Sequence, residues 1–422
     1  MRRWSRSARQ VLHRLTSPRA GQKVRFVHAS VLLRFVVLYA LMYGAYGVSS
    51  PFMPAFFERR GLGPEQLGVL FGIGIAIRLI SGPLCGRLAD LTQALRGVLA
   101  SCVVVAAVVA VALLGVVGFP ALLAISLLHA AALAPTTTLA DALALDASAP
   151  RAADARFEYG WVRGTGSGAF VLGTLLSGQV VSAWGFGSIL VLQSAQLTVA
   201  ACMSLLLPAP VQSRSVTGRV EPAPTQGVVR LFRIAEFRRV TLISTLVLGS
   251  HAMHDTFAVI RWGEAGVSPA MVSVLWSESV AAEVVVFFLI GPSLVKRLGP
   301  GRVMALAAAA GFVRWVVVAS TTAVTALALI QPLHGLTFAA LHLACMRVIP
   351  VIIPPGLAAT AQAMYALGAG AATAVLTVAS GHLYARVGAQ AFLMMALLCA
   401  AAAPLALGLR WAAPPHEGRT QA

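Results

Sequence analysis

Several ionisable side chains lie inside stretches of the sequence that are otherwise apolar. Such groups are costly inside a bilayer, so those that occur there are candidates for binding a solute or carrying protons. Asp141 and Arg163 lie at facing ends of two consecutive apolar stretches, which predicts either a site for solute and coupling or a structural ion pair. Glu283, Arg314 and His334 lie on three successive stretches and predict a cluster of carboxylate, guanidinium and imidazole, as a proton relay needs.

Carboxylates are scarce in the second half of the chain. No Asp or Glu occurs between Glu283 and Glu417. Glu283 is flanked by alanine and valine, and an apolar surround favours the neutral, proton-loaded acid. We therefore predict that Glu283 is the principal proton-carrying carboxylate of this half, with a permanent Glu283–Arg314 ion pair as the structural alternative.

The residues that hold metals, phosphates or cofactors elsewhere are not arranged for such roles. His251 and His254 share one helix face, but no third ligand accompanies them. The only lysines, Lys23 and Lys296, do not end a G-x-x-x-x-G-K-[ST] phosphate loop. We therefore expect no metal, no cofactor and no enzyme activity, and an energy source in a gradient or a partner.

The composition shows what must position these side chains. Of 422 residues, 58% are hydrophobic and 11% are charged, whereas a soluble domain carries about 25% charged residues. A chain with so little polar surface cannot face water on all sides. This excludes a soluble enzyme, a disordered chain and a secreted disulfide scaffold, and it indicates an integral membrane protein embedded in the lipid bilayer.

The apolar stretches have the length of membrane helices, which need about 20 mostly apolar residues each. They predict an all-α protein of twelve transmembrane helices, near 31–57, 66–86, 97–117, 120–145, 160–183, 187–207, 240–261, 270–291, 303–322, 324–347, 355–384 and 390–411.

Positive charge gathers in two polar segments of this chain of net charge +18. These segments hold Arg2, Arg3, Arg6, Arg9, Arg14, Arg19, Lys23 and Arg25 before the first span, and Arg214, Arg219, Arg230, Arg233, Arg238 and Arg239 in mid-chain. Cytoplasmic flanks of membrane helices accumulate Lys and Arg. We therefore predict a multi-pass protein of the inner (plasma) membrane with both termini in the cytoplasm, and no nucleic-acid partner.

The two halves of the chain resemble each other. Gly82-Pro83 is followed by Arg87, and Gly291-Pro292 is followed by Lys296, an offset of 209 residues. A repeated six-helix unit is typical of transporters with a site between the repeats. The predicted organisation is a basic tail, a bundle, a central cytoplasmic loop, a second bundle and a second tail, at 1–30, 31–207, 208–239, 240–411 and 412–422.

A loop motif after the second span is similar to the signature of the major facilitator superfamily. Residues 86–90 read Gly-Arg-Leu-Ala-Asp, the first half of G-x-L-A-D-R-x-G-R, whereas Leu91 and Gln93 depart from the second half. The resemblance implies two pseudo-symmetric six-helix bundles, with Gly86 and Asp90 in a loop that controls conformation.

Five further segments resemble the phenylpropionate permease group of that superfamily. They are Glu158 to Arg163, Leu275-Trp276 with Glu283, Leu333 to Phe338 with His342, Gln362 to Tyr365, and Gly381 to Tyr384. This resemblance implies an aromatic monocarboxylate as solute. The residues assigned to solute binding are Arg78, Asp141, Arg163, Tyr43, Tyr365 and Gln362.

A more distant resemblance extends to sugar:proton symporters such as lactose permease. Arg314 and His334 match an Arg and a His of that group, and Arg163 matches an Arg that binds sugar there. The proton-carrying Glu of that group is Thr337 here. Either His334 or Glu283 then takes its place, or transport is uncoupled.

The sequence thus predicts a monomeric permease that imports a small organic solute with protons by alternating access. A sugar or nucleoside symporter and an exporter are the alternatives within transport. A receptor or assembly factor on the same scaffold is the alternative from another class, because a fold does not fix a function.

Overall fold

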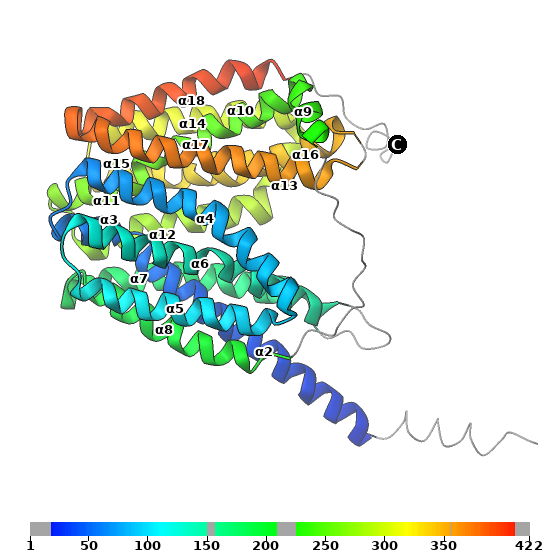
Figure 1. Cartoon of the computed structure of the whole chain (residues 1–422). Helices are drawn as coiled ribbons and strands as arrows, with labels where there is room; N and C mark the ends of the chain where they lie inside the picture. Colours follow the sequence, from blue (N-terminus) through cyan, green and yellow to red (C-terminus); the bar gives the residue numbers. More distant parts are fainter. Residues whose placement is uncertain (1–17, 150–156, 209–224, 355, 410–422) are drawn as a thin grey trace, which may run out of the picture.

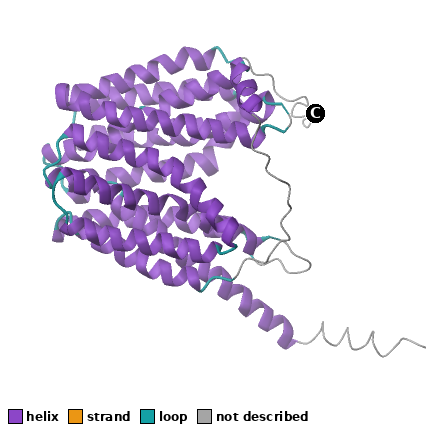
Figure 2. Cartoon of the chain, viewed as in Figure 1, coloured by secondary structure: helices purple, strands orange, loops and turns teal. Residues whose placement is uncertain are grey.

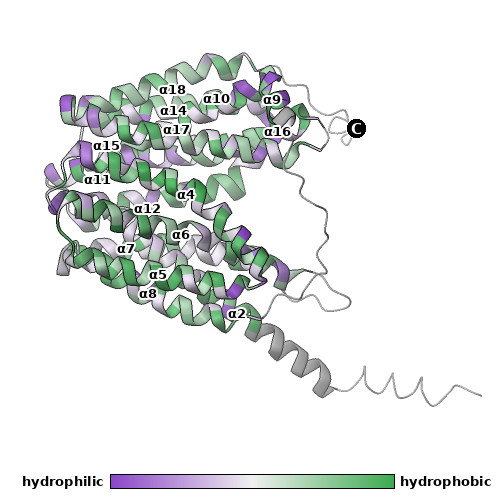
Figure 3. Ribbon diagram, in the orientation of Figure 1, coloured by the Kyte–Doolittle hydropathy of each residue, from purple (hydrophilic) through white to green (hydrophobic). Residues whose placement is uncertain are grey.

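The computed structural model describes residues 18–149, 157–208, 225–354 and 356–409. Within these ranges the protein is helical and contains no strand (Figures 1 and 2). Large apolar side chains such as Val108 and Leu289 are exposed on the helices, and hydrophilic residues gather mainly near helix ends (Figure 3). Apolar outer faces and internally bonded backbone are what a bilayer requires. The predicted tail 412–422, part of the central loop 208–239 and residues 1–17 lie outside the described residues.

The first bundle is built from six long helices and one short one. They are α2 (Pro18–Ser49), α3 (Met53–Arg59), α4 (Pro64–Thr92), α5 (Leu95–Gly115), α6 (Phe119–Ser148), α7 (Tyr159–Trp184) and α8 (Ser188–Leu205). Helix α2 packs against α7 and α8, and α5 packs against α6 and α8. The sequence predicted one span over 31–57, but α2 ends before Pro51 because proline has no N–H to continue the helix.

The second bundle contains more interrupted helices. They are α9 (Thr225–Arg233), α10 (Ala235–Gly249), α11 (His251–Glu264), α12 (Pro269–Val285), η1 (Val286–Ile290), α13 (Gly291–Leu298), α14 (Pro300–Ser320), α15 (Val324–Ile330), η2 (Gln331–Leu333), η3 (Leu336–Ala340), α16 (Leu341–Ile352), α17 (Ala358–Val387), η4 (Gly388–Gln390) and α18 (Ala391–Leu407). Two of the interruptions, η1 and η3, are π-helical turns, which recur at functional sites.

Ten stretches of the described residues are long and apolar enough to cross a membrane. Ala358–Leu407 counts there as one stretch, although the chain turns through η4 between α17 and α18. Helices α10 and α11 are too short to count singly, with 15 and 14 residues. The all-helical, two-bundle membrane fold predicted from the sequence is confirmed, and the helices are consistent with twelve crossings.

The two bundles repeat a structural detail. In the first bundle, the Arg60 guanidinium donates to the Leu114 and Val116 carbonyls at the end of α5. In the second, the Arg261 guanidinium donates to the Val318 and Ala319 carbonyls at the end of α14. Each arginine thus satisfies carbonyls that the helix end leaves unpaired, and the repetition supports the duplicated unit.

The bundles meet closely at one side of the molecule. A Cβ on Gly68 of α4 would lie 2.9 Å from the Gly381 Cα of α17, and a Cβ on Gly178 of α7 would lie 2.2 Å from the Ser273 Oγ of α12. At the opposite ends of α4 and α7, Gly82 and Gly160 have nothing within 4 Å of a built Cβ. We call the end where α4 begins, at which the bundles touch, the closed side, and the opposite end, where α18 ends and the ribbons of the two bundles lie apart, the open side (Figure 1).

The close approach at Gly68 should control how often the closed side separates. We expect Gly68→Ala to weaken the α4–α17 contact, because the added methyl meets backbone that cannot yield and such overpacking costs about 1–3 kcal/mol. The readout is the labelling rate of a cysteine placed at Thr377, which is buried beside Gly68, by an impermeant maleimide added at the closed side, and this rate should rise severalfold. The control Gly82→Ala adds a methyl in open space, and equal labelling of both variants would contradict the prediction.

Candidate functional site

Two adjoining cavities lie between the bundles. The first has a volume of about 530 Å³ and is lined largely by α2, α4 and α6, and the second has about 390 Å³ and is lined by α11, α12, η3 and α17. Ser50, Asp255 and Thr373 line both. Of the residues that line them, only Arg78 and Asp255 carry a full charge. These volumes are typical of sites for small organic molecules.

Asp141 is held by two tyrosines. The Tyr39 hydroxyl donates to Asp141 Oδ1 at 2.5 Å, and the Tyr159 hydroxyl donates to the same oxygen at 2.8 Å. The three side chains come from three helices: Tyr39 from α2, Asp141 from α6 and Tyr159 from the first turn of α7. Hydrogen bonds to a charged acceptor are short and strong, so Asp141 is stabilised without a cation beside it.

Arg163 lies close to the same tyrosines, but not in an ion pair with Asp141. Its Cζ lies 4.9 Å from the centroid of the Tyr43 ring, which stacks on Tyr39 at 5.6 Å. One guanidinium nitrogen, Nη1, is buried without a hydrogen-bond partner in the described structure. Of the two alternatives that the sequence left open, the structural one is not formed as a direct ion pair among the described residues, and the role in solute binding or coupling stays a prediction. The two charges are connected through Tyr43 and Tyr39, because the aromatic ring offers Arg163 a cation–π contact.

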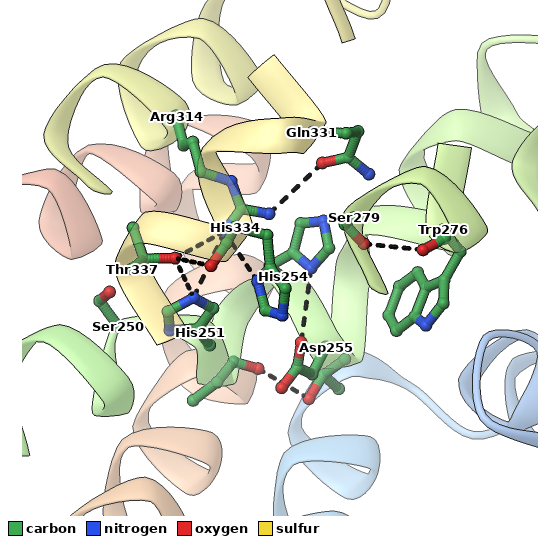
Figure 4. A network of polar contacts seen from close by, with 12 residues as sticks. Ser250, His251, His254, Asp255, Trp276, Ser279, Arg314, Gln331, His334 and Thr337 are labelled. Carbon is green, nitrogen blue, oxygen red and sulfur yellow. Dashed lines mark hydrogen bonds and ion pairs between the residues drawn. The ribbon is translucent and has the colours of Figure 1, made fainter. Parts of the chain in front are cut away.

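Arg314 is the centre of the polar network in the second bundle (Figure 4). The side chain is fully buried, and its Cζ lies 4.7 Å from the Trp315 ring centroid. Its neutral acceptors are His251 Nε2 and His334 Nδ1, both at 3.3 Å from Nη1, Thr337 Oγ1 at 3.4 Å from Nη1, and Gln331 Oε1 at 3.3 Å from Nη2. The positive charge is thus solvated by the protein itself rather than by a carboxylate.

The hydrogen bonds assign one tautomer to each histidine of this network. His251 Nδ1 faces the Val247 and Leu248 carbonyls, which only accept, so the ring proton belongs on Nδ1 and Nε2 accepts from Arg314. His334 accepts from Arg314 through Nδ1, so its ring proton belongs on Nε2. Both imidazoles are therefore neutral beside the guanidinium.

His334 links Arg314 to Glu283. The His334 Nε2 lies 3.5 Å from Glu283 Oε2, and no direct Glu283–Arg314 ion pair is formed within the described ranges. A Cβ on Gly335 would lie 2.7 Å from the Ala282 carbonyl oxygen, so this glycine lets the helix backbone that carries His334 approach α12. The predicted grouping of Glu283, Arg314 and His334 is present, with the imidazole between the two charges.

The sequence did not predict three partners of Arg314, namely His251, Gln331 and Thr337. A signal for two of them was available, because Gln331 and Thr337 lie three residues before and after His334 and therefore share its helix face. His254 is a further buried histidine of α11. Its ring stacks on Trp276 at 5.2 Å and contacts Trp262 and Trp315, so it packs in an aromatic cage.

The remaining predicted residues are dispersed. Arg78 lines the first cavity, but Tyr365 is buried in the second bundle, where Ser244 donates to its hydroxyl at 2.8 Å. Gln362 is exposed and lines neither cavity. Gly86 and Asp90 lie at the end of α4 on the open side, where Asp90 is exposed. Among the described residues, no three His, Cys, Asp or Glu side chains are grouped to hold a metal.

Comparison with known proteins decides the family. The model of the MFS_1 like family matches residues 32–395. The chain belongs to this family. It is 32% identical over 372 residues to the "Probable 3-phenylpropionic acid transporter" of Escherichia coli (strain K12), which covers 85% of this chain and 93% of the relative. It is 22% identical over 329 residues, or 78% of this chain and 80% of the relative, to the "Uncharacterized transporter YwbF" of Bacillus subtilis (strain 168).

Solved structures of transporters share the fold of this family member. The nucleoside transporter NupG (D323A mutant) superposes with a TM-score of 0.77 at 19% identity, over 89% of this chain and 98% of the other. A bacterial homolog of the human lysosomal transporter Spinster, in an inward-facing and unoccupied conformation, gives a TM-score of 0.70 at 15% identity, over 90% and 96% of the chains. The predicted resemblance to major facilitator permeases is thus confirmed.

Two double-mutant cycles distinguish the tyrosine contacts from a direct ion pair. We expect Tyr39→Phe and Asp141→Asn to be coupled by about 1.5–3 kcal/mol, because a phenol donates to a charged carboxylate. Arg163→Gln and Asp141→Asn should be coupled by less than about 0.5 kcal/mol, because no ion pair joins them. The free energy of unfolding of the purified protein in detergent measures both, and stronger coupling to Arg163 than to Tyr39 would refute the arrangement.

Proposed function

We propose that this member of the MFS_1 like family is a secondary transporter that imports an aromatic monocarboxylate with one proton by alternating access. It acts without enzymatic chemistry, as a monomer of the inner membrane with both termini in the cytoplasm. The two bundles at 31–207 and 240–411 are the moving units. The likeness to the phenylpropionic acid transporter of Escherichia coli supports the solute class.

The observation that carries the proposal is the connection from Glu283 through His334 to the buried Arg314. Ionised Glu283 adds a negative charge beside His334, and protonation of Glu283 makes the network more positive by one charge. Uncompensated charge in a low-dielectric site is costly, so an anionic solute in the cavity binds best when Glu283 carries its proton. Proton and carboxylate then travel together, which is symport.

Arg163 connects the first bundle to the charge balance around Glu283. It belongs to the first bundle, yet it lies within electrostatic range of Glu283, and no carboxylate contacts it directly among the described side chains. A solute carboxylate that approaches Arg163 therefore competes with Glu283 for the positive charge of Arg163. This competition gives Glu283 different proton affinities in the empty and loaded states, as coupling between two ligands requires.

Reconstituted vesicles test the function directly. A monocarboxylate that enters with one proton carries no net charge, so a pH gradient should drive its uptake and a membrane potential alone should not. An inward gradient of one pH unit should sustain about tenfold accumulation, since that is the free energy of one proton over one unit. The panel comprises 3-phenylpropionate, lactose and uridine, with protein-free vesicles as the control for passive entry. Uptake of lactose or uridine instead of the acid would favour the alternatives.

Glu283→Gln separates proton coupling from solute movement. The amide mimics the loaded carboxylic acid, so we expect accumulation driven by one pH unit to fall from about tenfold to none. Exchange of labelled for unlabelled solute across the membrane should persist, because exchange needs no net proton movement. Parallel measurement of gradient-driven uptake and counterflow in vesicles provides the comparison.

The matched control is Glu278→Gln, which removes an acid of the same helix that has no contact with His334 in the described structure, whereas Glu283 Oε2 lies 3.5 Å from His334 Nε2. This variant should keep both activities. If Glu283→Gln still concentrates the solute with normal pH dependence, Glu283 is not the proton carrier.

A further inference from the structure

We propose that Asp255 selects solutes that carry a hydrogen-bond donor, so that the preferred substrates are aromatic acids with a ring hydroxyl. The inference rests on the proposed import of aromatic monocarboxylates and narrows that solute class. An acidic side chain in the cavity of an anion transporter needs an explanation, because it repels the carboxylate that the transporter must bind. A hydrogen-bond donor on the solute explains the acid, because the Asp255 carboxylate can accept a hydrogen bond from it.

Opposite charges face the first cavity from the two bundles. Arg78 belongs to α4 and Asp255 to α11, and both line this cavity of about 530 Å³. No ion pair joins them, and Arg78 has no hydrogen bond to any described residue. Both charges are therefore available to a ligand. A carboxylate binds at Arg78 and is repelled by Asp255, which orients the solute along the cavity.

Asp255 is prepared as an acceptor. His254 Nδ1 lies 3.4 Å from Asp255 Oδ1 (Figure 4). The His254 ring contacts three tryptophans, namely Trp262, Trp276 and Trp315. The second carboxylate oxygen has no partner in the described part of the chain, and the side chain is 57% exposed. A carboxylate with a free oxygen in the cavity accepts a phenolic hydroxyl without first losing another hydrogen-bond partner.

The cavity between these charges suits an aromatic ring. Its lining includes Phe57, Leu70 and Phe71, which offer apolar and aromatic contacts. A solute with its carboxylate at Arg78 and its hydroxyl at Asp255 touches both bundles at once. Such a solute stabilises the state in which the bundles close around it, because a ligand shifts a conformational equilibrium by its differential affinity for the states.

Competition among matched acids tests the inference. The probes are 3-phenylpropionate, 3-(4-hydroxyphenyl)propionate, its 3-hydroxy isomer and the 4-methoxy analogue, which has the oxygen but no donor. We expect a hydroxylated acid to bind the wild-type protein about tenfold or more tightly than both the unsubstituted and the methoxy acid, since a hydrogen bond to a charged group has this value. Inhibition of labelled uptake and calorimetric binding to purified protein give independent affinities.

Asp255→Asn should reduce this preference to about threefold or less, because the charge-assisted bond becomes a neutral one. Glu278→Gln, the acid-to-amide control outside the cavities, should keep the wild-type preference. Wild-type protein that binds the four acids equally, or an Asp255→Asn variant that keeps the preference, overturns the inference while the proposed function stands. Loss of binding of all four acids in Asp255→Asn also overturns it, since Asp255 then serves every substrate. Binding of none of them by the wild type refutes the proposed function itself.

Discussion

The charge of Arg314 is the constraint on which the second bundle depends. A fully buried guanidinium must be solvated by the protein, and here neutral oxygen and nitrogen acceptors from α11, η2 and η3 surround it. This requirement fixes the tautomers of His251 and His334 and aligns the helices that carry them. It also explains the contribution of the Gly335 contact, which brings His334 between Arg314 and Glu283.

A common pattern connects the acids and bases of both bundles. Asp141 is linked to Arg163 through two stacked tyrosines, and Glu283 is linked to Arg314 through an imidazole. Direct ion pairs would satisfy each charge and leave little gain for a ligand. Separation by a neutral ring keeps the charges ordered while it leaves them responsive to a proton or a carboxylate, as the proposed coupling requires.

The sequence predicted the parts of this structure that depend on composition and order. The low content of charged residues and the repeated apolar stretches predicted the two-bundle fold. Three ionisable residues on successive spans predicted the grouping of Glu283, Arg314 and His334. The sequence left a direct Asp141–Arg163 ion pair open as one alternative, and none is formed among the described residues, because helical spacing does not fix which neighbour a side chain meets and Tyr39 and Tyr159 offer nearer partners. The π-helical turns arise from packing between helices, which has no local signature in one sequence.

The glycine contacts at the closed side determine the character of its opening. Gly68 and Gly381 bring backbone against backbone, where attraction arises from dispersion over short distances. Dispersion is lost steeply with separation, and a gap of about 0.5–1 Å already forfeits a quarter to a half of it. Long, flexible side chains could stay in contact while two helices move apart, whereas glycines, which have no side chain, cannot. The contact between α4 and α17 at these glycines should therefore be either fully formed or fully broken. Few intermediate widths would then exist through which protons could pass.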